Sequence, residues 1–340
     1  MNQKSLFIPI TVAVLFVLGL VLMFNLTPGV ETPAPTVSET QPGVTQPVVQ
    51  ADAPLTTEPT QPAAIPTEPP PPPDTTLPAG QAITAHHAFV YDTAQQRLLF
   101  YSGDPDSPVY PASITKLMTA YVVQKYMDPS TKVTVGEEIT WIDPYSSVAE
   151  LKVGDQLSVK LLIYGLMLPS GNDAAYTLAV ACGRVIAEDP TLDRQLAYYV
   201  FVDEMNAEAR LLGMTNTHFV TADGNHDDNH YTSINDLAIL LDAVLDNELI
   251  MAAAQTPTKD VSQELGRAVT WKNSNLLLHS SSTYYTSSAV GMKTGSTTAG
   301  GACLISLFAQ EEGCLAVGVF GSNGDDNRYL DTLLLYNLYK

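Results

Sequence analysis

From about residue 81 onward, the hydrophobic residues first follow the spacing of strands and then the spacing of helices. Two strand-like runs, 85–91 and 97–101, come first, and the short polar segment between them predicts a β-hairpin at the edge of a sheet. In the middle, apolar residues recur at the intervals typical of helices that bury one face. These intervals predict helices over 113–127, 158–168, 174–186, 192–212 and 233–245, with short strands at 132–135 and 149–153.

Strand signals return near the end of the chain, at 288–292, 302–308 and 314–321, and a last helix is predicted over 325–339. The second and third of these strands are separated by a short turn, which indicates an antiparallel pair. An order of strands, helices, strands and a closing helix favours an α+β fold. We therefore expect one antiparallel sheet built from both ends of this region, flanked by helices, with an inserted helical lobe.

The first 80 residues follow a different pattern. Residues 6–26 carry no charge and are long enough for a transmembrane helix, so we predict a signal-anchor that places the N-terminus inside. An atypical signal peptide that is cleaved is the alternative. Residues 27–80 hold 15 of the 24 prolines, six acidic residues and no basic one, which predicts a disordered Pro/Thr-rich linker. Both interpretations place residues 81–340 outside the cytoplasm.

Charge and cysteine content narrow the choice of function. The formal net charge is −20, of which residues 81–340 carry −15. A domain this acidic is a poor binder of nucleic acid, because phosphate binding depends on clusters of Lys and Arg. Cys182, Cys303 and Cys314 show no metal-type spacing, so we expect buried thiols. In a simple hairpin Cys314 would face Ala309, which disfavours the alternative of a disulfide to Cys303.

Candidate chemistry begins where the first predicted helix begins. Ser113 lies at its N-terminus, where backbone N–H groups have no partner within the helix. Lys116 follows on the same face, about one turn away. A hydroxyl, an amine and free N–H donors in one place are the parts of an acyl-transfer nucleophile. Taken alone, the pattern also fits a Ser cap followed by a solvated Lys.

Two later motifs decide between these interpretations. Ser170-Gly-Asn lies on the loop between two predicted helices, and Lys293-Thr-Gly ends a predicted strand. With Ser113-Ile-Thr-Lys they form, in order, the Ser-x-x-Lys, Ser-x-Asn and Lys-Thr-Gly set of penicillin-binding proteins and related β-lactamases. Each motif is short and arises by chance, but the ordered set in suitable structural contexts favours an enzyme.

The sequence around these motifs resembles the D-alanyl-D-alanine carboxypeptidases, which are low-molecular-weight penicillin-binding proteins of the serine peptidase type. The resemblance is carried by segments 110–120, 168–175, 205–214 and 291–304 and covers essentially all of residues 81–340. It implies a β-lactamase/transpeptidase-like fold and a penicillin-binding D,D-peptidase domain over residues 81–340. The chain departs from the family at Asp223-Gly-Asn-His, where members have Gly-Leu.

The chemistry of the residue types then gives each motif a role. Ser113 is the expected nucleophile, attacking the carbonyl of the penultimate D-Ala to give an acyl-enzyme. Lys116 acts as base only if its pKa is lowered, which burial and the second cation Lys293 would both promote. Ser170 relays the proton to the departing D-Ala amine. Asn172 positions Lys116 and the substrate peptide group.

On the substrate side, Lys293 and Thr294 supply a cation and a hydroxyl for the terminal carboxylate. Gly295 lets the substrate backbone lie against the strand, where a side chain would block it. By resemblance, the oxyanion hole uses the backbone N–H groups of Ser113 and Ser296. No metal ion and no cofactor is expected.

Two features stand outside this assignment. Segment 226–230 contains two His and two Asp residues, and we interpret it as a solvated loop, with a metal site as the weaker alternative. Arg328, near the start of the last predicted helix, is expected at the surface.

The leading functional hypothesis is a serine-type D,D-carboxypeptidase that trims the terminal D-Ala from peptidoglycan stem peptides and is acylated by β-lactam antibiotics. A D,D-endopeptidase, a serine β-lactamase and a non-catalytic peptidoglycan-binding module are the alternatives. The expected location is the bacterial cell membrane, single-pass through the N-terminal segment with an extracytoplasmic catalytic domain. Cleavage of that segment would make the domain secreted or wall-associated.

Overall fold

The computed structural model describes residues 70–340, so the predicted signal-anchor and most of the predicted linker lie outside the described residues. Within residues 70–340, no helix is long and apolar enough to span a bilayer. The last part of the predicted linker contacts the folded domain. The N–H of Asp74 donates to the Leu99 carbonyl at 2.8 Å, and the Tyr339 hydroxyl donates to the Asp74 carboxylate at 2.9 Å. The folded unit therefore begins before residue 81.

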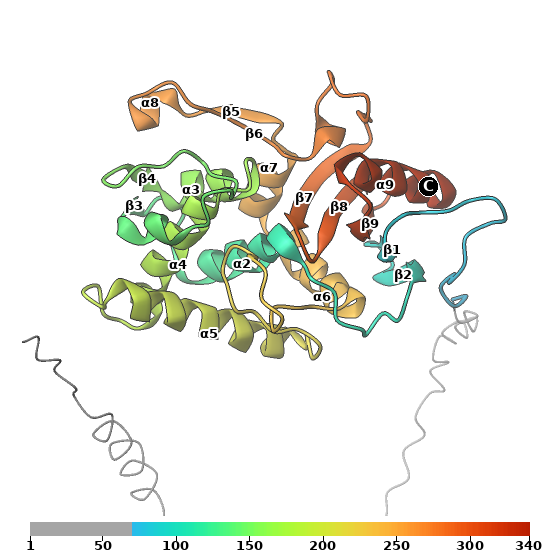
Figure 1. The fold of residues 1–340 in the computed structure, drawn as a ribbon, viewed down its shortest axis with the longest axis horizontal. Coiled ribbons are helices and arrows are strands. Elements are labelled where there is room, and N and C mark those ends of the chain that lie inside the picture. The colour runs from blue at the N-terminus through green and yellow to red at the C-terminus, as the bar shows by residue number, and fades with distance from the viewer. Residues whose placement is uncertain (1–69) are drawn as a thin grey trace, which may run out of the picture. The chain divides into compact units, whose positions relative to one another are not determined.

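A five-stranded antiparallel sheet forms one half of the described unit (Figure 1). Its strand order is β2-β1-β9-β8-β7, so the first hairpin of the chain pairs with the last strand. β2 and β7 are the two edges. The strands are β1 (His87–Asp92), β2 (Arg97–Ser102), β7 (Ala289–Thr297), β8 (Gly301–Ala309) and β9 (Cys314–Ser322). The predicted sheet built from both ends of the region is confirmed.

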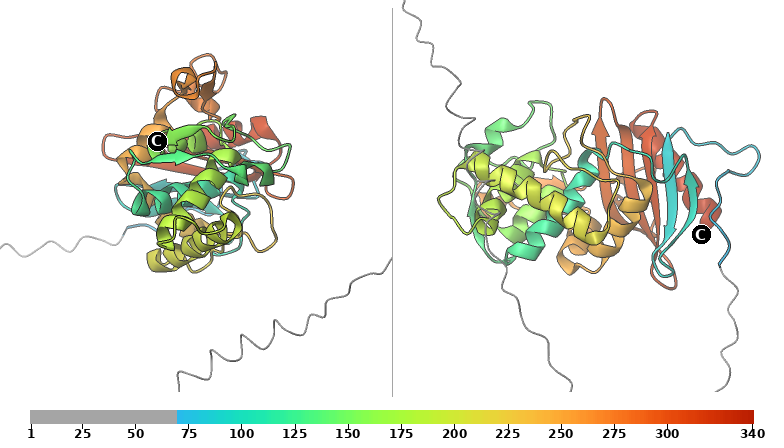
Figure 2. Two further views of the ribbon diagram at one scale, coloured as in Figure 1. Left: turned by 90° about the vertical axis from the view of Figure 1, so that its left-hand side faces the viewer. Right: turned by 90° about the horizontal axis from the view of Figure 1, so that it is seen from below.

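The two faces of the sheet bury separate groups of side chains, because successive strand residues point to opposite sides. In β8, Leu304 and Phe308 face α9 (Asp325–Tyr339), and the Phe308 ring stacks on Tyr336 with centroids 4.0 Å apart. Ile305 and Leu307 belong instead to the core shared with the helical lobe. The sheet thus lies between α9 and the helical lobe (Figures 1 and 2).

The helical lobe forms the other half and packs around α4. Of the 15 residues of α4, 11 are buried, which is the pattern of a helix enclosed by its neighbours. Its N-terminus lies at the boundary between lobe and sheet, where the candidate residues are found. The lobe contains α2 (Lys116–Tyr126), α3 (Val159–Met167), α4 (Asn172–Ile186), α5 (Arg194–Leu212), α6 (Ile234–Leu245) and α7 (Glu248–Gln255).

The predicted strand at 149–153 is wrong. The N–H groups of Ala149 and Leu151 donate to the carboxylate of Asp173, at 2.7 and 2.9 Å, and not to a neighbouring strand. Glu150 between them has φ 60°, which is incompatible with an extended chain. The strand that pairs with β3 (Lys132–Thr134) is β4 (Gln156–Ser158).

Two further differences concern the segment before the last strands. β7 continues to Thr297, so Lys293-Thr-Gly lies inside the strand and does not end it. An excursion that the hydrophobic pattern did not predict precedes β7. It contains β5 (Thr258–Asp260), α8 (Ser262–Leu265) and β6 (Thr270–Lys272), followed by the short helix η3 (Leu276–Leu278).

The cysteines are arranged as predicted, with Cys314 facing Ala309 and not Cys303. Cys314 lies opposite Ala309 across the β8–β9 pair. Cys182 and Cys303 are buried, Cys314 is half-buried, and all three thiols are free.

Candidate active site

The three sequence motifs meet where the helical lobe joins the edge strand β7 (Figure 1). Ser113 comes from the short helix η1 (Ala112–Thr115), which leads directly into α2. Ser170 and Asn172 come from the turn into α4, and Lys293 comes from β7. The structure thus brings together residues separated by up to 180 positions, as the ordered motifs predict.

Lys116 has no exposed surface, and its Nζ has three oxygen neighbours. These are Ser113 Oγ at 2.8 Å, Asn172 Oδ1 at 2.8 Å and the Asp223 carbonyl oxygen at 2.7 Å. An amide oxygen and a carbonyl oxygen can only accept. When Lys116 is neutral, its two N–H groups can remain on these two acceptors, and its lone pair is then free to accept the proton of Ser113.

Burial lowers the pKa of Lys116 to about 8, because the charged form loses its hydration, although the carboxylates of Asp223 and Asp173 oppose the shift. About a tenth of the molecules therefore carry a neutral Lys116 at pH 7. The predicted downward direction is confirmed with burial as its main cause, whereas the predicted contribution of Lys293 is not among the causes of the shift.

Ser170 and Lys293 form a second serine–lysine pair. Lys293 Nζ donates to Ser170 Oγ at 2.8 Å and to the Thr294 carbonyl at 3.0 Å. Ser170 has φ 60°, an unusual backbone conformation for a serine, which is found mostly where surrounding contacts fix a functional side chain. Lys293 is fully buried, and its pKa is held well below the ordinary value by burial and then by the charges of Lys116 and Arg328.

Gly295 explains why β7 can lie against Ser113. A Cβ at this position would be 3.0 Å from the backbone nitrogen of Ser113 and 3.0 Å from the Pro111 carbonyl oxygen, closer than such contacts normally come. Ser296, the next residue, is exposed. Because β7 is the edge of the sheet, an extended peptide could add alongside it within reach of Ser113.

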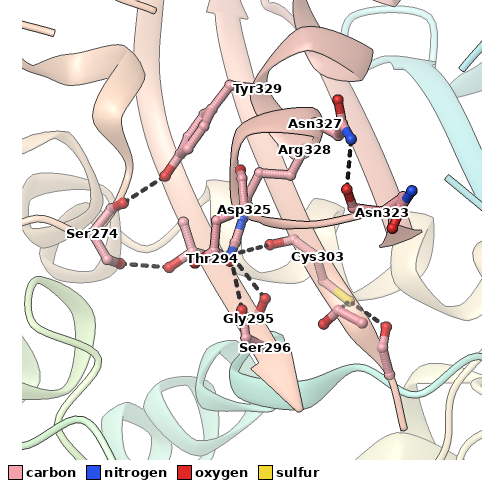
Figure 3. Close-up of polar contacts among 12 residues, drawn as sticks. Ser274, Thr294, Gly295, Ser296, Cys303, Asn323, Asp325, Asn327, Arg328 and Tyr329 are labelled. Atoms are coloured by element: carbon pink, nitrogen blue, oxygen red, sulfur yellow. Dashed lines mark hydrogen bonds and ion pairs between the residues drawn. The ribbon is translucent and has the colours of Figure 1, made fainter. Parts of the chain in front are cut away.

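The Thr294 hydroxyl belongs to a group of hydrogen bonds that also includes Ser274 and Tyr329 (Figure 3). It lies 2.5 Å from the Ser274 hydroxyl, and the Tyr329 hydroxyl donates to the Ser274 carbonyl at 2.9 Å. Thr294 is itself buried. Ser274 was not singled out from the sequence, since nothing in its neighbourhood marks it.

Arg328 was expected at the surface, and this prediction is wrong. Its guanidinium is buried against β7 and β8 and donates to the carbonyl of Gly295 at 2.9 Å and of Cys303 at 3.2 Å (Figure 3). It also donates to the Ser296 hydroxyl at 2.8 Å and pairs with the Asp325 carboxylate. A cation in the first turn of a helix interacts unfavourably with the helix dipole. This unusual position of Arg328 was the sequence signal that could have indicated a specific contact.

The predicted solvated loop at 226–230 is only partly correct. Asp227 and Asp228 are accessible, but His230 is 2% exposed and lies 2.8 Å from the Thr115 hydroxyl. Across residues 70–340, no cluster of three or more His, Cys, Asp or Glu side chains is arranged to hold a metal ion.

A family model described as D-alanyl-D-alanine carboxypeptidase matches residues 74–324. This chain belongs to the D-alanyl-D-alanine carboxypeptidase family. A carboxypeptidase of that name from Streptomyces sp. (strain K15) is 35% identical over 224 residues, covering 63% of this chain and 72% of the relative. The carboxypeptidase DacD of Escherichia coli (strain K12) is 33% identical over 253 residues, covering 70% of this chain but only 58% of DacD.

Solved structures agree with this family assignment. The crystal structure of the Streptomyces K15 DD-transpeptidase matches with a TM-score of 0.67 and 30% identity, covering 76% of this chain and 97% of that one. Penicillin-binding protein D2 from Listeria monocytogenes, in its cefotaxime-bound form, matches with a TM-score of 0.62 and 25% identity over 76% of this chain and 98% of that one. The predicted transpeptidase-like α+β fold and the family resemblance are both confirmed.

Proposed function

We propose that this member of the family is a serine-type D-Ala-D-Ala carboxypeptidase that removes the terminal D-Ala of peptidoglycan pentapeptides. The observation that carries the proposal is the setting of Lys116, which is fully buried, held by two fixed acceptors and 2.8 Å from the hydroxyl of Ser113. A lysine in this setting can remove the serine proton near neutral pH.

Acylation begins when neutral Lys116 accepts the Ser113 proton and Ser113 Oγ attacks the carbonyl carbon of the penultimate D-Ala. The backbone N–H groups of Ser113 and Ser296 stabilise the resulting oxyanion. Ser170, paired with Lys293, passes a proton to the departing nitrogen, so the C–N bond breaks and D-Ala leaves as the free amino acid. Water then attacks the ester, and Ser113 recovers its proton as the shortened peptide departs.

Substrate binding uses the edge of β7. Asn172 offers its amide to Lys116 and to the substrate peptide group. Because Gly295 has no side chain, β7 can lie against Ser113, so a substrate backbone that adds to this edge comes close to the nucleophile. Lys293 meets the terminal carboxylate, and the Thr294 hydroxyl joins it by turning from Ser274 toward the substrate. Since burial and two neighbouring cations lower the pKa of Lys293, an arriving carboxylate would raise it again and restore the charge that binds it.

The same chemistry accounts for β-lactams as inhibitors, because their strained amide would acylate Ser113 in place of the peptide. Penicillin-binding protein D2 from Listeria monocytogenes, which shares the fold, was solved with cefotaxime bound to it. Peptidoglycan stem peptides and β-lactams are therefore the proposed partners of this chain, with no role for nucleic acid or a metal.

We also propose that residues 6–26 anchor the protein in the bacterial cell membrane, that residues 27–80 act as a linker whose last part contacts the domain, and that the catalytic domain lies outside the cytoplasm. The uncharged length of residues 6–26 supports this location. Fractionation of cells that produce the full chain tests it: protein in the membrane pellet is expected, and processed protein in the medium would favour a cleaved signal.

A fluorescent penicillin and a pentapeptide test the function. We expect the wild-type protein to form a covalent penicillin adduct that Ser113→Ala abolishes, and mass spectrometry to detect loss of one D-Ala from the pentapeptide. Absence of an adduct on folded wild-type protein would contradict the catalytic proposal and favour a binding module. Cleavage of crosslinked dimers without D-Ala release would favour an endopeptidase, and rapid loss of the label a β-lactamase.

A further inference from the structure

One acceptor of the catalytic lysine is a main-chain carbonyl, and a buried histidine fixes the loop that carries it. Asp223 lies on the connection between α5 and α6, which passes the start of α2 (Figure 1). Its carbonyl accepts from Lys116 Nζ at 2.7 Å and lies 3.5 Å from Ser113 Oγ. The position of this carbonyl therefore affects where Lys116 Nζ points.

His230 contacts this loop with one ring nitrogen and η1 with the other. Its Nδ1 accepts from the N–H groups of Val220, at 3.0 Å, and Thr221, at 3.2 Å. Because two donors share Nδ1, that nitrogen must hold a lone pair, and we assign the ring proton to Nε2. Nε2–H then donates to the hydroxyl of Thr115, 2.8 Å away.

The loop and the start of α2 are closely packed against each other. Gly224, which follows Asp223, has φ +83°, and a Cβ there would lie 1.9 Å from the Ala112 carbonyl oxygen and 2.9 Å from Thr115 Oγ1. Thr115 is also the direct chain neighbour of Lys116. The ring of His230 thus ties the loop to the residue that precedes the catalytic lysine.

We propose that His230 is a positioning residue for the base. As the neutral Nε2–H tautomer, it holds residues 220–224 against Thr115 and so keeps the Asp223 carbonyl on Lys116. This inference rests on the proposed role of Lys116 as base, and it explains why part of the 226–230 segment is buried and not solvated.

The surroundings of His230 favour the neutral ring. Burial is the main cause that lowers its pKa to about 4; His218, His226 and Lys116 lower it further, while Asp227 opposes the shift. At the pH of a cell surface the ring is uncharged, and Nδ1 remains available to the two loop N–H groups.

Two amide substitutions separate positioning from packing. The side chain of His230→Asn can place its oxygen where Nδ1 lies and so keep the loop acceptor, whereas His230→Gln reaches only toward Thr115. We expect His230→Gln to lower the second-order rate constant of acylation by fluorescent penicillin by about 10- to 100-fold, since small displacements of reacting groups have effects of this size. His230→Asn keeps the loop contact and loses only the contact with Thr115, so its rate should fall clearly less than that of His230→Gln.

A role in packing alone predicts the opposite order, because asparagine is smaller than glutamine and leaves the larger cavity. His87→Gln, on the far hairpin of the sheet, serves as the matched control, and circular dichroism checks that each variant is folded. Wild-type acylation together with equal rates for the two His230 variants, or a slower rate for His230→Asn, would overturn the inference while leaving the proposed function intact. A wild-type protein that is not acylated would refute both.

Discussion

Lys116 at the start of α2 and Lys293 in β7 are both fully buried, and each lies 2.8 Å from a serine hydroxyl. The charges that surround the two lysines differ in sign. Lys116 lies near the carboxylates of Asp223 and Asp173, which partly offset the effect of burial on its pKa. Lys293 has no such compensation among its main influences: burial and the cations Lys116 and Arg328 all lower its pKa.

The difference indicates two tasks for one residue type. A base must exchange its proton near the working pH, which suits the value of about 8 for Lys116. A buried lysine whose pKa is lowered by burial and by neighbouring cations gains most when an anion arrives, which suits Lys293 as the binder of a substrate carboxylate. Replacing each lysine by methionine, which keeps the length of the side chain, tests this division.

Lys116→Met should have the largest effect. Without the amine, nothing next to Ser113 Oγ accepts its proton, so we expect the rate of acylation by penicillin to fall by about 10³-fold, within the range lost with a general base. The rate is measured by stopped-flow or gel fluorescence. Lys125→Met, on the same helix but half-exposed, is the control and should acylate normally. A loss smaller than tenfold would remove Lys116 from the role of base.

Lys293→Met should act on substrate binding. Loss of a charged hydrogen bond to the terminal carboxylate is expected to lower kcat/KM for a pentapeptide by about 30- to 100-fold, equivalent to about 2–3 kcal/mol. A substrate whose terminal carboxylate is amidated should lose much less, and that comparison is the control. Equal losses for both substrates would show that Lys293 serves the chemical step and not carboxylate recognition.

The pH dependence of acylation should follow the neutral fraction of Lys116. With a folded-state pKa of about 8, that fraction falls from about half at pH 8 to about 1% at pH 6, so the rate should drop about tenfold per pH unit below 8. The unfolded lysine keeps its ordinary value of 10.5, so the unfolded chain binds more protons between pH 8 and 10.5. This group therefore makes the protein more stable as pH rises through that window. A midpoint near 10.5 would contradict the assignment.

Much of this comparison could be predicted from the sequence, because it depends on residue types at fixed spacing. Ser113 and Lys116 lie one turn apart in any helix, and the ordered motifs predict that Asn172 and Lys293 join them. The α+β order also follows from the change between strand and helix spacing.

What could not be predicted depends on tertiary contacts. The Asp223 carbonyl is a main-chain group, and any residue supplies one, so its side chain carries no signal for the contact with Lys116. Arg328 and His230 are polar residues that the fold buries only because β8 and the 220–224 loop provide their partners. Residues 149–153 have the composition of a strand, but Asp173 captures their N–H groups.

The Asp173→Asn substitution should have the smallest effect on the rate of acylation, and it should act mainly on the pH dependence of that rate. Its carboxylate accepts the N–H groups of Ala149 and Leu151 and raises the pKa of Lys116. Asp173→Asn removes that charge, so the midpoint of the pH profile should fall below 8. The new NH₂ group would also oppose the Leu151 N–H, which should lower the free energy of unfolding by about 1–3 kcal/mol.

The matched control for Asp173→Asn is Asp155→Asn. Asp155 binds Arg267, which donates to the Glu150 carbonyl at 2.6 Å, so this variant loosens the same segment without removing a charge that acts on Lys116. It should lower the stability and leave the midpoint unchanged. Urea unfolding and acylation between pH 5 and 10 measure the two effects separately. The proposed difference between Lys116 and Lys293 would be contradicted by a midpoint of the pH profile that rises or stays at 8 in Asp173→Asn. In that case burial alone would set the pKa of both lysines.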